Sequence, residues 1–329
     1  MARRDGAIVT AYLDETGAKR QTDAKRQTGA KRQTGADCDI VAAMADSREQ
    51  AMIPTSNYAT VLGTELHYME WGVGHPGTVI AWHGLARTGR DMDDIAAHLA
   101  RRWRVICPDT IGRGLSQWSR APEREYCFAH YERLAAALLD HLRLDSVHWL
   151  GTSMGGALGL HAAAGALRGR IAKLVLNDIG PEVAAAAIVR IRNYAGSPPA
   201  FDTVGELEAY FRTVYKPYGA ISDAQWRRLA ESSTRRLPDG RVTPHYDPAM
   251  VMQFVHHPHD YDQWDAWDRL AIPVLVLRGA DSDLLEPAVA QRMTERGPRA
   301  TLITVPGCGH APALNTPEHF AWVEDFLAR

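Results

Sequence analysis

A serine lies at the centre of the five-residue motif Gly151–Thr152–Ser153–Met154–Gly155, which has the form G-x-S-x-G. The apolar run 146–150 precedes the motif, and a segment rich in alanine, glycine and leucine follows it. A serine on a sharp turn from a strand into a helix exposes its hydroxyl, and small neighbours let the strand and the helix approach closely. The N-terminus of such a helix also favours negative charge. The pattern predicts a nucleophile elbow, with Ser153 as the nucleophile.

A serine hydroxyl is a weak nucleophile at neutral pH, so it needs a base, and the base needs a carboxylate that orients it. The chain has 14 histidines, and His310 differs from the others because it lies in a glycine-rich loop, 306–312, after the last apolar run. In a mainly parallel sheet, functional loops gather at the carboxyl ends of the strands. We therefore predict that His310 reaches Ser153 and acts as the general base.

Three aspartates are candidates for the carboxylate that supports His310. Asp281 and Asp283 follow the apolar run 273–277, whereas Asp178 ends the run 173–177. We prefer Asp283, and we interpret Asp281 as a turn-forming residue. Asp178 is the alternative acid, because the end of its strand could approach the same imidazole ring.

An oxyanion formed during attack by Ser153 requires backbone N–H donors. One donor is expected from Met154, the residue after the nucleophile, and the second from Leu85, in the loop that follows the run 78–82. The neighbouring His83 is expected to make hydrogen bonds within that loop rather than to take part in the reaction.

The elements that position these residues follow from the hydrophobic pattern. Alternation on both sides of Gly63 predicts an antiparallel hairpin over 60–71. Six apolar runs predict further strands, and the segments between them predict helices. The expected strands are 78–82, 104–107, 146–150, 173–177, 273–277 and 301–305, and the expected helices are 92–101, 128–142, 154–166, 287–295 and 317–327. Buried strands that alternate with helices indicate an α/β fold with a mainly parallel, doubly wound sheet.

Two regions depart from this alternation. Residues 181–270 contain helical stretches and several aromatic residues but no strong strand signal, which predicts a helical cap inserted into a core made of 58–180 and 271–329. Residues 1–50 contain the hexapeptides AKRQTD and AKRQTG in tandem over 18–35. This repeat is too short and polar to bury a core, so we predict a disordered N-terminal tail.

These motifs together resemble the α/β-hydrolase superfamily, in its cap-bearing branch of small serine esterases. The resemblance covers 58–329, in the chain order serine, aspartate, histidine. The matching segments are 83–84, 109–116, 151–155, 279–283 and 309–310. The family more often places its acid three residues after the glycine that corresponds to Gly279, and that position is Ser282 here. Some relatives carry the acid one residue later, at the position of Asp283, and others carry a carboxylate at the position of Asp178.

The expected function is hydrolysis of a small carboxylic ester through an acyl-enzyme intermediate. Lactone, C–C bond or amide hydrolysis could use the same triad, and a non-catalytic ligand-binding protein of this fold is a further alternative. No metal or dinucleotide motif is present, so no cofactor is expected. The net charge of −2 gives no reason to expect nucleic acid as a partner. No run reaches the roughly 18 apolar residues of a membrane span, and four cysteines form no disulfide framework; we therefore expect a cytoplasmic protein. The sequence carries no signal for an oligomeric state.

Overall fold

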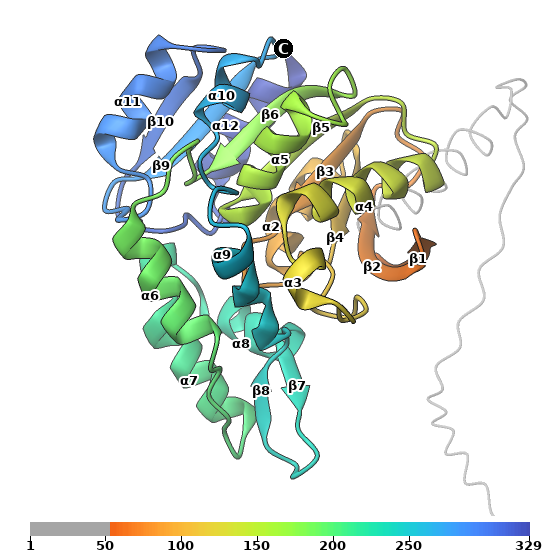
Figure 1. The fold of residues 1–329 in the computed structure, drawn as a ribbon, viewed down its shortest axis with the longest axis vertical. Helices are drawn as coiled ribbons and strands as arrows, with labels where there is room; N and C mark the ends of the chain where they lie inside the picture. The colour runs from red at the N-terminus through yellow and green to blue at the C-terminus, as the bar shows by residue number, and fades with distance from the viewer. Residues whose placement is uncertain (1–52) are drawn as a thin grey trace, which may run out of the picture. The chain divides into compact units, whose positions relative to one another are not determined.

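A computed structural model describes residues 53–329, and Figure 1 shows its helices and strands. The prediction of a disordered tail over 1–50 lies outside the described residues. Within the described residues, no helix combines the length and the apolar composition that crossing a membrane requires.

An eight-stranded sheet forms the centre of the described region, with the strand order β1-β2-β4-β3-β5-β6-β9-β10. β1 pairs with β2 and β2 pairs with β4 in antiparallel fashion, and every other pairing in this sheet is parallel. The strands are β1 (Thr55–Val61), β2 (Thr64–Trp71), β3 (Thr78–Trp82), β4 (Arg104–Pro108), β5 (Val147–Thr152), β6 (Ile171–Asn177), β9 (Val274–Gly279) and β10 (Thr301–Val305). The mainly parallel α/β fold predicted from the sequence is confirmed.

The central strands form because their residues can be buried on both faces. All five residues of β3 and all six of β9 are buried, and both strands are rich in valine, leucine and isoleucine. Such continuous apolar runs are typical of parallel strands covered by helices on two sides. One face packs against α4 (Phe128–His141), α5 (Met154–Ala164) and α11 (Pro287–Glu295). The other packs against α2 (Asp93–Leu99) and α12 (Pro317–Ala328).

A largely helical segment separates β6 from β9, as the sequence predicted for 181–270. It also has a small core of its own, built around Leu207, Phe211 and Trp226. Its helices are α6 (Ala185–Ala195), α7 (Val204–Val214), α8 (Asp223–Ser232), α9 (Gln253–His256) and α10 (Trp264–Asp268), with short 3₁₀ turns η2 (Lys216–Tyr218) and η3 (Pro248–Met252). In Figure 1, α6 and α7 extend away from the sheet toward the lower end of the view.

This segment also contains a two-stranded antiparallel hairpin, β7 (Thr234–Arg236) and β8 (Val242–Pro244), which the sequence analysis missed. Helix α8 ends at Ser232, and the chain enters β7 two residues later. Each strand has only three residues, too few for a visible alternation. The remaining short elements, η1 (Gly89–Met92) and α3 (Pro122–Glu125), precede α2 and α4.

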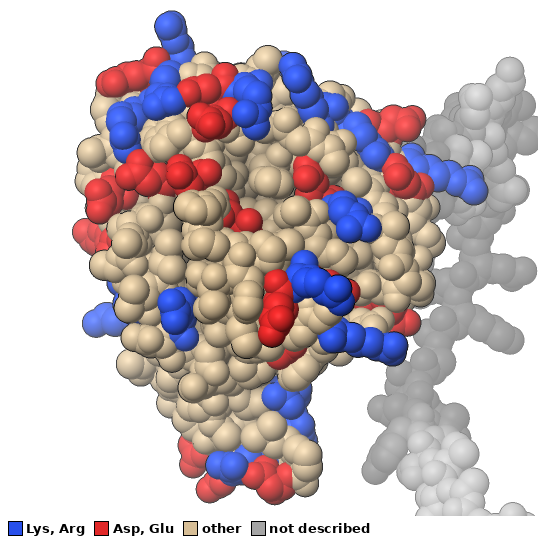
Figure 2. Space-filling model, viewed as in Figure 1, with Lys and Arg blue, Asp and Glu red and all other residues tan. Residues whose placement is uncertain are grey.

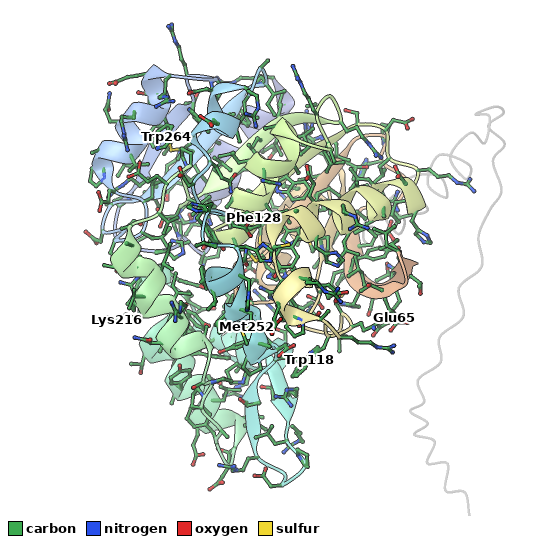
Figure 3. The ribbon with its side chains drawn as sticks, viewed as in Figure 1. Glu65, Trp118, Phe128, Lys216, Met252 and Trp264 are labelled. Carbon is green, nitrogen blue, oxygen red and sulfur yellow. The ribbon has the colours of Figure 1, made fainter. Side chains whose placement is uncertain are left out.

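Aromatic side chains join the inserted segment to the sheet-covering helices. Phe128, at the start of α4 and near the middle of Figure 3, has its ring centroid 4.9 Å from that of Tyr261 and 6.4 Å from that of Tyr131. The backbone N–H of Phe128 donates to Asp260 at 2.9 Å. These contacts attach the inserted segment to α4 close to the sheet.

Charged side chains are interspersed on the outside of the molecule. On the face shown in Figure 2, acidic and basic groups alternate in small clusters. Much of the middle of that face is uncharged.

Candidate active site

Ser153 occupies a strained turn between β5 and α5. Its backbone angles, φ 51° and ψ −119°, lie in a region that residues other than glycine rarely adopt. Neighbouring glycines permit this turn: a Cβ on Gly155 would lie 2.4 Å from the carbonyl oxygen of Trp82, and one on Gly151 would lie 2.2 Å from that of Gly155. The elbow predicted from the sequence motif is therefore present, with the serine at its tip.

His310 lies beside the serine, in the loop between β10 and α12. Its Nε2 is 2.8 Å from Oγ of Ser153, and its Nδ1 is 2.8 Å from Oδ2 of Asp178. Because an ionised carboxylate can only accept, Nδ1 carries the hydrogen and Nε2 is left to accept the hydrogen of the serine hydroxyl. The ring is thus held in the tautomer in which a histidine can remove a proton from serine.

Asp178 is the carboxylate that meets this ring. It follows β6 directly, has a φ of 56°, and is fully buried. Its Oδ1 accepts the backbone N–H of Gly279 at 2.9 Å, and its Oδ2 also accepts the hydroxyl of Ser282 at 2.6 Å. Three hydrogen-bond donors therefore contact the two carboxylate oxygens of Asp178, and they replace the water that burial removes from its negative charge.

The preference for Asp283 as the acid was wrong. Asp283 is exposed, and its carboxylate pairs with Arg190 of α6 rather than with His310. Asp281 is also exposed, and its backbone N–H bonds to Cys308 in the loop after β10, consistent with its expected place in a turn. The loop after β9 directs Asp283 toward α6 of the inserted segment, whereas Gly279 and Ser282 of the same loop donate hydrogen bonds to Asp178.

The two expected oxyanion donors lie next to the serine. Met154 is the first residue of α5. Leu85 follows Gly84, where an added Cβ would lie 3.7 Å from Cβ of Ser153. His83 fixes this loop, as expected: its Nδ1 donates to the carbonyl of Gly84 at 2.6 Å, and its Nε2 accepts the N–H of Thr110 at 3.0 Å.

The bond from His83 matters because the carbonyl of Gly84 belongs to the same peptide unit as the N–H of Leu85. Holding that oxygen fixes the plane of the peptide and therefore the direction of the N–H. Burial lowers the pKa of His83 to about 4, so the ring stays neutral and keeps one donor and one acceptor at neutral pH. Arg113, which the sequence analysis did not single out, supports the loop further by donating to the carbonyl of Leu85 at 3.0 Å.

A cavity of about 500 Å³ opens over Ser153 and His310. Residues of the loop after β3 and of the inserted segment form its walls, including Arg87 and the five tyrosines Tyr194, Tyr210, Tyr215, Tyr218 and Tyr246. A small apolar recess, lined by Ile179, Ile188 and Phe254 among others, also reaches Ser153. Ser153 therefore faces a larger, tyrosine-rich space and a smaller apolar one.

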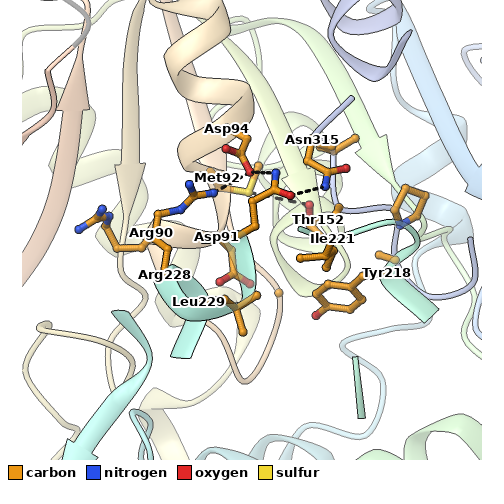
Figure 4. A pocket seen from close by; sticks show the side chains of 16 residues that line it. Arg90, Asp91, Met92, Asp94, Thr152, Tyr218, Ile221, Arg228, Leu229 and Asn315 are labelled. Carbon is orange, nitrogen blue, oxygen red and sulfur yellow. Dashed lines mark hydrogen bonds and ion pairs between the residues drawn. The ribbon is translucent and has the colours of Figure 1, made fainter. Parts of the chain in front are cut away.

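A separate pocket lies between η1, the start of α2, α8 and the loop 311–315 (Figure 4). There Asp94 accepts hydrogen bonds from Arg228 at 2.7 Å and from Gln225 at 2.9 Å, so the pocket ties the inserted segment to the core. It shares Gly84, Thr152, Tyr218 and Ala311 with the walls of the larger cavity but does not include Ser153. Among residues 53–329, no cluster of three or more His, Cys, Asp or Glu side chains is placed to hold a metal ion.

Comparisons with known proteins agree with this architecture. The family model of the alpha/beta hydrolase fold matches residues 77–317. The 3-hydroxybutyrate-oligomer hydrolase of Cupriavidus necator is 36% identical over 270 residues, which cover 79% of this chain and 92% of that protein. A non-heme haloperoxidase of Rhodococcus erythropolis is also 36% identical, over 75% of this chain and 90% of the relative. The crystal structure of an alpha/beta hydrolase from Novosphingobium aromaticivorans superposes with a TM-score of 0.75 at 35% identity, over 84% of this chain and 98% of that one. The chain belongs to the α/β-hydrolase family.

Proposed function

We propose that this hydrolase cleaves carboxylic esters through a covalent acyl-enzyme, with Ser153, His310 and Asp178 as its triad. Ser153 Oγ attacks the ester carbonyl while His310 Nε2 takes its proton, and Asp178 stabilises the imidazolium that forms. The N–H groups of Leu85 and Met154 bind the resulting oxyanion. His310 returns the proton to the departing alcohol, and a water molecule then attacks the acyl-enzyme by the same route.

The continuous chain of hydrogen bonds from Asp178 through His310 to Ser153 is the observation that carries this proposal. Both bonds are 2.8 Å long, within the range in which proton transfer requires no rearrangement of the side chains. The serine at the end of this chain faces a cavity of about 500 Å³, a size typical of small-molecule sites.

Within this class we propose a short oligoester of a hydroxy acid as the substrate. The similarity to the Cupriavidus necator oligomer hydrolase extends over most of both chains and supports this choice. An oligoester offers carbonyl, hydroxyl and carboxylate oxygens along its length. The tyrosines of the larger cavity supply hydroxyl donors for such oxygens, whereas the apolar recess suits a short alkyl group.

The mechanism is tested with an active-site label and a substrate panel. A fluorophosphonate probe should label the wild-type protein and leave Ser153→Ala unlabelled; labelling of the variant would refute the role of Ser153. The panel compares linear dimers and trimers of 3-hydroxybutyrate with p-nitrophenyl butyrate, a lactone, an anilide and a vinylogous diketone. Faster turnover of any of the last three than of the esters would replace ester hydrolysis by lactone, amide or C–C bond hydrolysis.

A further inference from the structure

Two spaces of very different size meet at Ser153. The larger cavity has a volume of about 500 Å³, and the apolar recess has a volume of about 20 Å³. Ser153 and Leu85 line both of them. His310, in contrast, lines the larger cavity and is not part of the wall of the recess. An ester carbonyl that Ser153 attacks therefore stands where the two spaces join, with His310 on the side of the larger one.

The chemistry of acyl transfer assigns one part of the ester to each space. In the proposed tetrahedral intermediate, the reacting carbon carries Oγ of Ser153, the oxyanion, the acyl chain and the alcohol oxygen. When the intermediate collapses, the bond from carbon to the alcohol oxygen breaks, and His310 gives its proton to that oxygen. The alcohol oxygen must therefore lie within hydrogen-bond reach of His310, on the side of the larger cavity. The recess is left for the acyl chain.

The recess is apolar, and its aromatic wall is firmly packed. Its lining consists of Leu85, Ser153, Ile179, Val183, Ile188, Ile191, Phe254, Tyr261 and Leu284. The rings of Phe254 and Tyr261 stack with their centroids 5.7 Å apart and an angle of 19° between their planes. Tyr261 also packs against Phe128 of α4, with the ring centroids 4.9 Å apart. This wall cannot recede without disturbing the contact with α4, so a long chain cannot easily push it back.

The volume of the recess limits the length of the acyl chain. A water-sized group needs about 10–15 Å³, so a recess of about 20 Å³ takes one or two groups of the size of a methyl. A two- to four-carbon acyl chain can end in such a space, whereas a six-carbon chain is too long for it. The larger cavity sets no comparable limit on the alcohol part.

We infer that the recess binds the acyl group of the substrate and restricts it to short chains, whereas the larger cavity binds the alcohol part. The inference rests on the ester-hydrolase function proposed above and adds the class of ester: a short acyl group joined to a larger alcohol. Ile188 of α6 is then a specificity-determining residue, because it lines the recess and not the larger cavity. In a hydroxy-acid oligoester, the ester attacked is the one whose acyl part is the hydroxyl-terminal unit, because any other places two or more units in the recess.

Two isomeric esters test this assignment. Hexyl acetate and ethyl hexanoate contain the same atoms and differ in which side of the ester carries the long chain. The kcat/KM of the wild-type protein should be at least about 10-fold higher for hexyl acetate, because each methylene that a pocket cannot accept weakens transition-state binding. An equal or higher kcat/KM for ethyl hexanoate would overturn the inference.

Variants of Ile188 change the size of the recess in both directions. Ile188→Ala should raise the kcat/KM for ethyl hexanoate relative to hexyl acetate by about fivefold or more, a gain that a damaged fold cannot produce. Ile188→Phe should fill the recess and lower the kcat/KM for p-nitrophenyl butyrate relative to p-nitrophenyl acetate. Val189→Ala, a change at the neighbouring exposed residue of α6, should keep both wild-type ratios. Wild-type ratios in both Ile188 variants would overturn the assignment of the recess to the acyl group.

A labelled oligoester gives an independent measurement. In the linear trimer of 3-hydroxybutyrate with deuterium only in its carboxyl-terminal unit, the first products should be unlabelled monomer and deuterated dimer. Deuterated monomer and unlabelled dimer would overturn the inference, because the acyl part would then be two units long. If the trimer alone is not cleaved, the oligoester substrate is wrong and the isomeric esters decide the inference. Failure of the proposed function would look different: the wild-type protein would cleave none of these esters, p-nitrophenyl butyrate included.

Discussion

Replacing Asp178 by asparagine tests the orientation of His310, the proposed general base. In the wild-type protein, Oδ1 of Asp178 accepts the N–H of Gly279, and Oδ2 accepts from Ser282 and His310. An asparagine must keep its oxygen toward the N–H of Gly279, because an amide N–H₂ there would face another donor. Its N–H₂ group then faces Nδ1 of His310.

This arrangement reverses the tautomer of the imidazole. An amide donor beside Nδ1 makes that nitrogen an acceptor, so the hydrogen moves to Nε2, which can no longer accept the proton of Ser153. In serine hydrolases the equivalent loss is about 10⁴-fold in kcat, or about 5 kcal/mol of transition-state stabilisation. We expect Asp178→Asn to reach this magnitude with little change in KM.

The control is Asp283→Asn, which removes an exposed ion pair to Arg190. Such pairs contribute about 0–1 kcal/mol, so its kcat should stay within about fivefold of the wild-type value. Steady-state hydrolysis of p-nitrophenyl butyrate, with active sites counted by fluorophosphonate titration, measures both. A loss in Asp178→Asn below about 30-fold, or a larger loss in Asp283→Asn, would refute the assignment of the acid.

Two further changes test the scaffold. The pKa of His83 is about 4 in the folded protein and 6.5 ordinarily. Between these two pH values the unfolded chain binds a proton at His83 that the folded protein does not bind. The free energy of unfolding therefore falls by up to about 3 kcal/mol as the pH is lowered through this window. The free energy of unfolding of His83→Gln, measured with urea at pH 7 and pH 4.5, should fall less between these pH values than that of the wild type. Equal falls in the two proteins would contradict the expectation. Gly155→Ala places a Cβ 2.4 Å from the carbonyl oxygen of Trp82, so it should lower the free energy of unfolding by about 1–3 kcal/mol and remove most of the activity. Gly205→Ala, whose added Cβ has no atom closer than 3.8 Å, should change neither. Equal unfolding midpoints for the two variants would contradict the close packing around Gly155.

The sequence was sufficient for the parts of the site that depend on local pattern. Ser153 and His310 each follow a predicted strand in a glycine-rich context, and both lie where that pattern places them. The identity of the acid cannot be predicted in this way, because β6 and β9 are neighbours in the sheet and an aspartate follows each of them. It depends on which of the two strand ends directs its carboxylate at the imidazole ring of His310. That choice is made by the backbone at Asp178, whose positive φ has no sequence signature.

Other features were missed for related reasons. The hairpin of β7 and β8 has strands too short for a periodic signal, although Asp239–Gly240 between them is a common turn pair and could have indicated it. Arg87 looks like any loop arginine in the sequence. Its burial comes from Phe211, Tyr215 and Ser233, which are more than a hundred residues away along the chain.

The bond between Ser282 and Asp178 has a consequence for how such sites diverge. Ser282 stands at the position where α/β-hydrolases more often carry their acid, three residues after Gly279, and its hydroxyl lies 2.6 Å from the carboxylate that replaces it. Two adjacent strand ends can therefore deliver a negative charge to nearly the same point in space. An ancestor with carboxylates at both strand ends could lose either one and still orient the imidazole ring. The position of the acid in the sequence could then change without passing through an inactive protein.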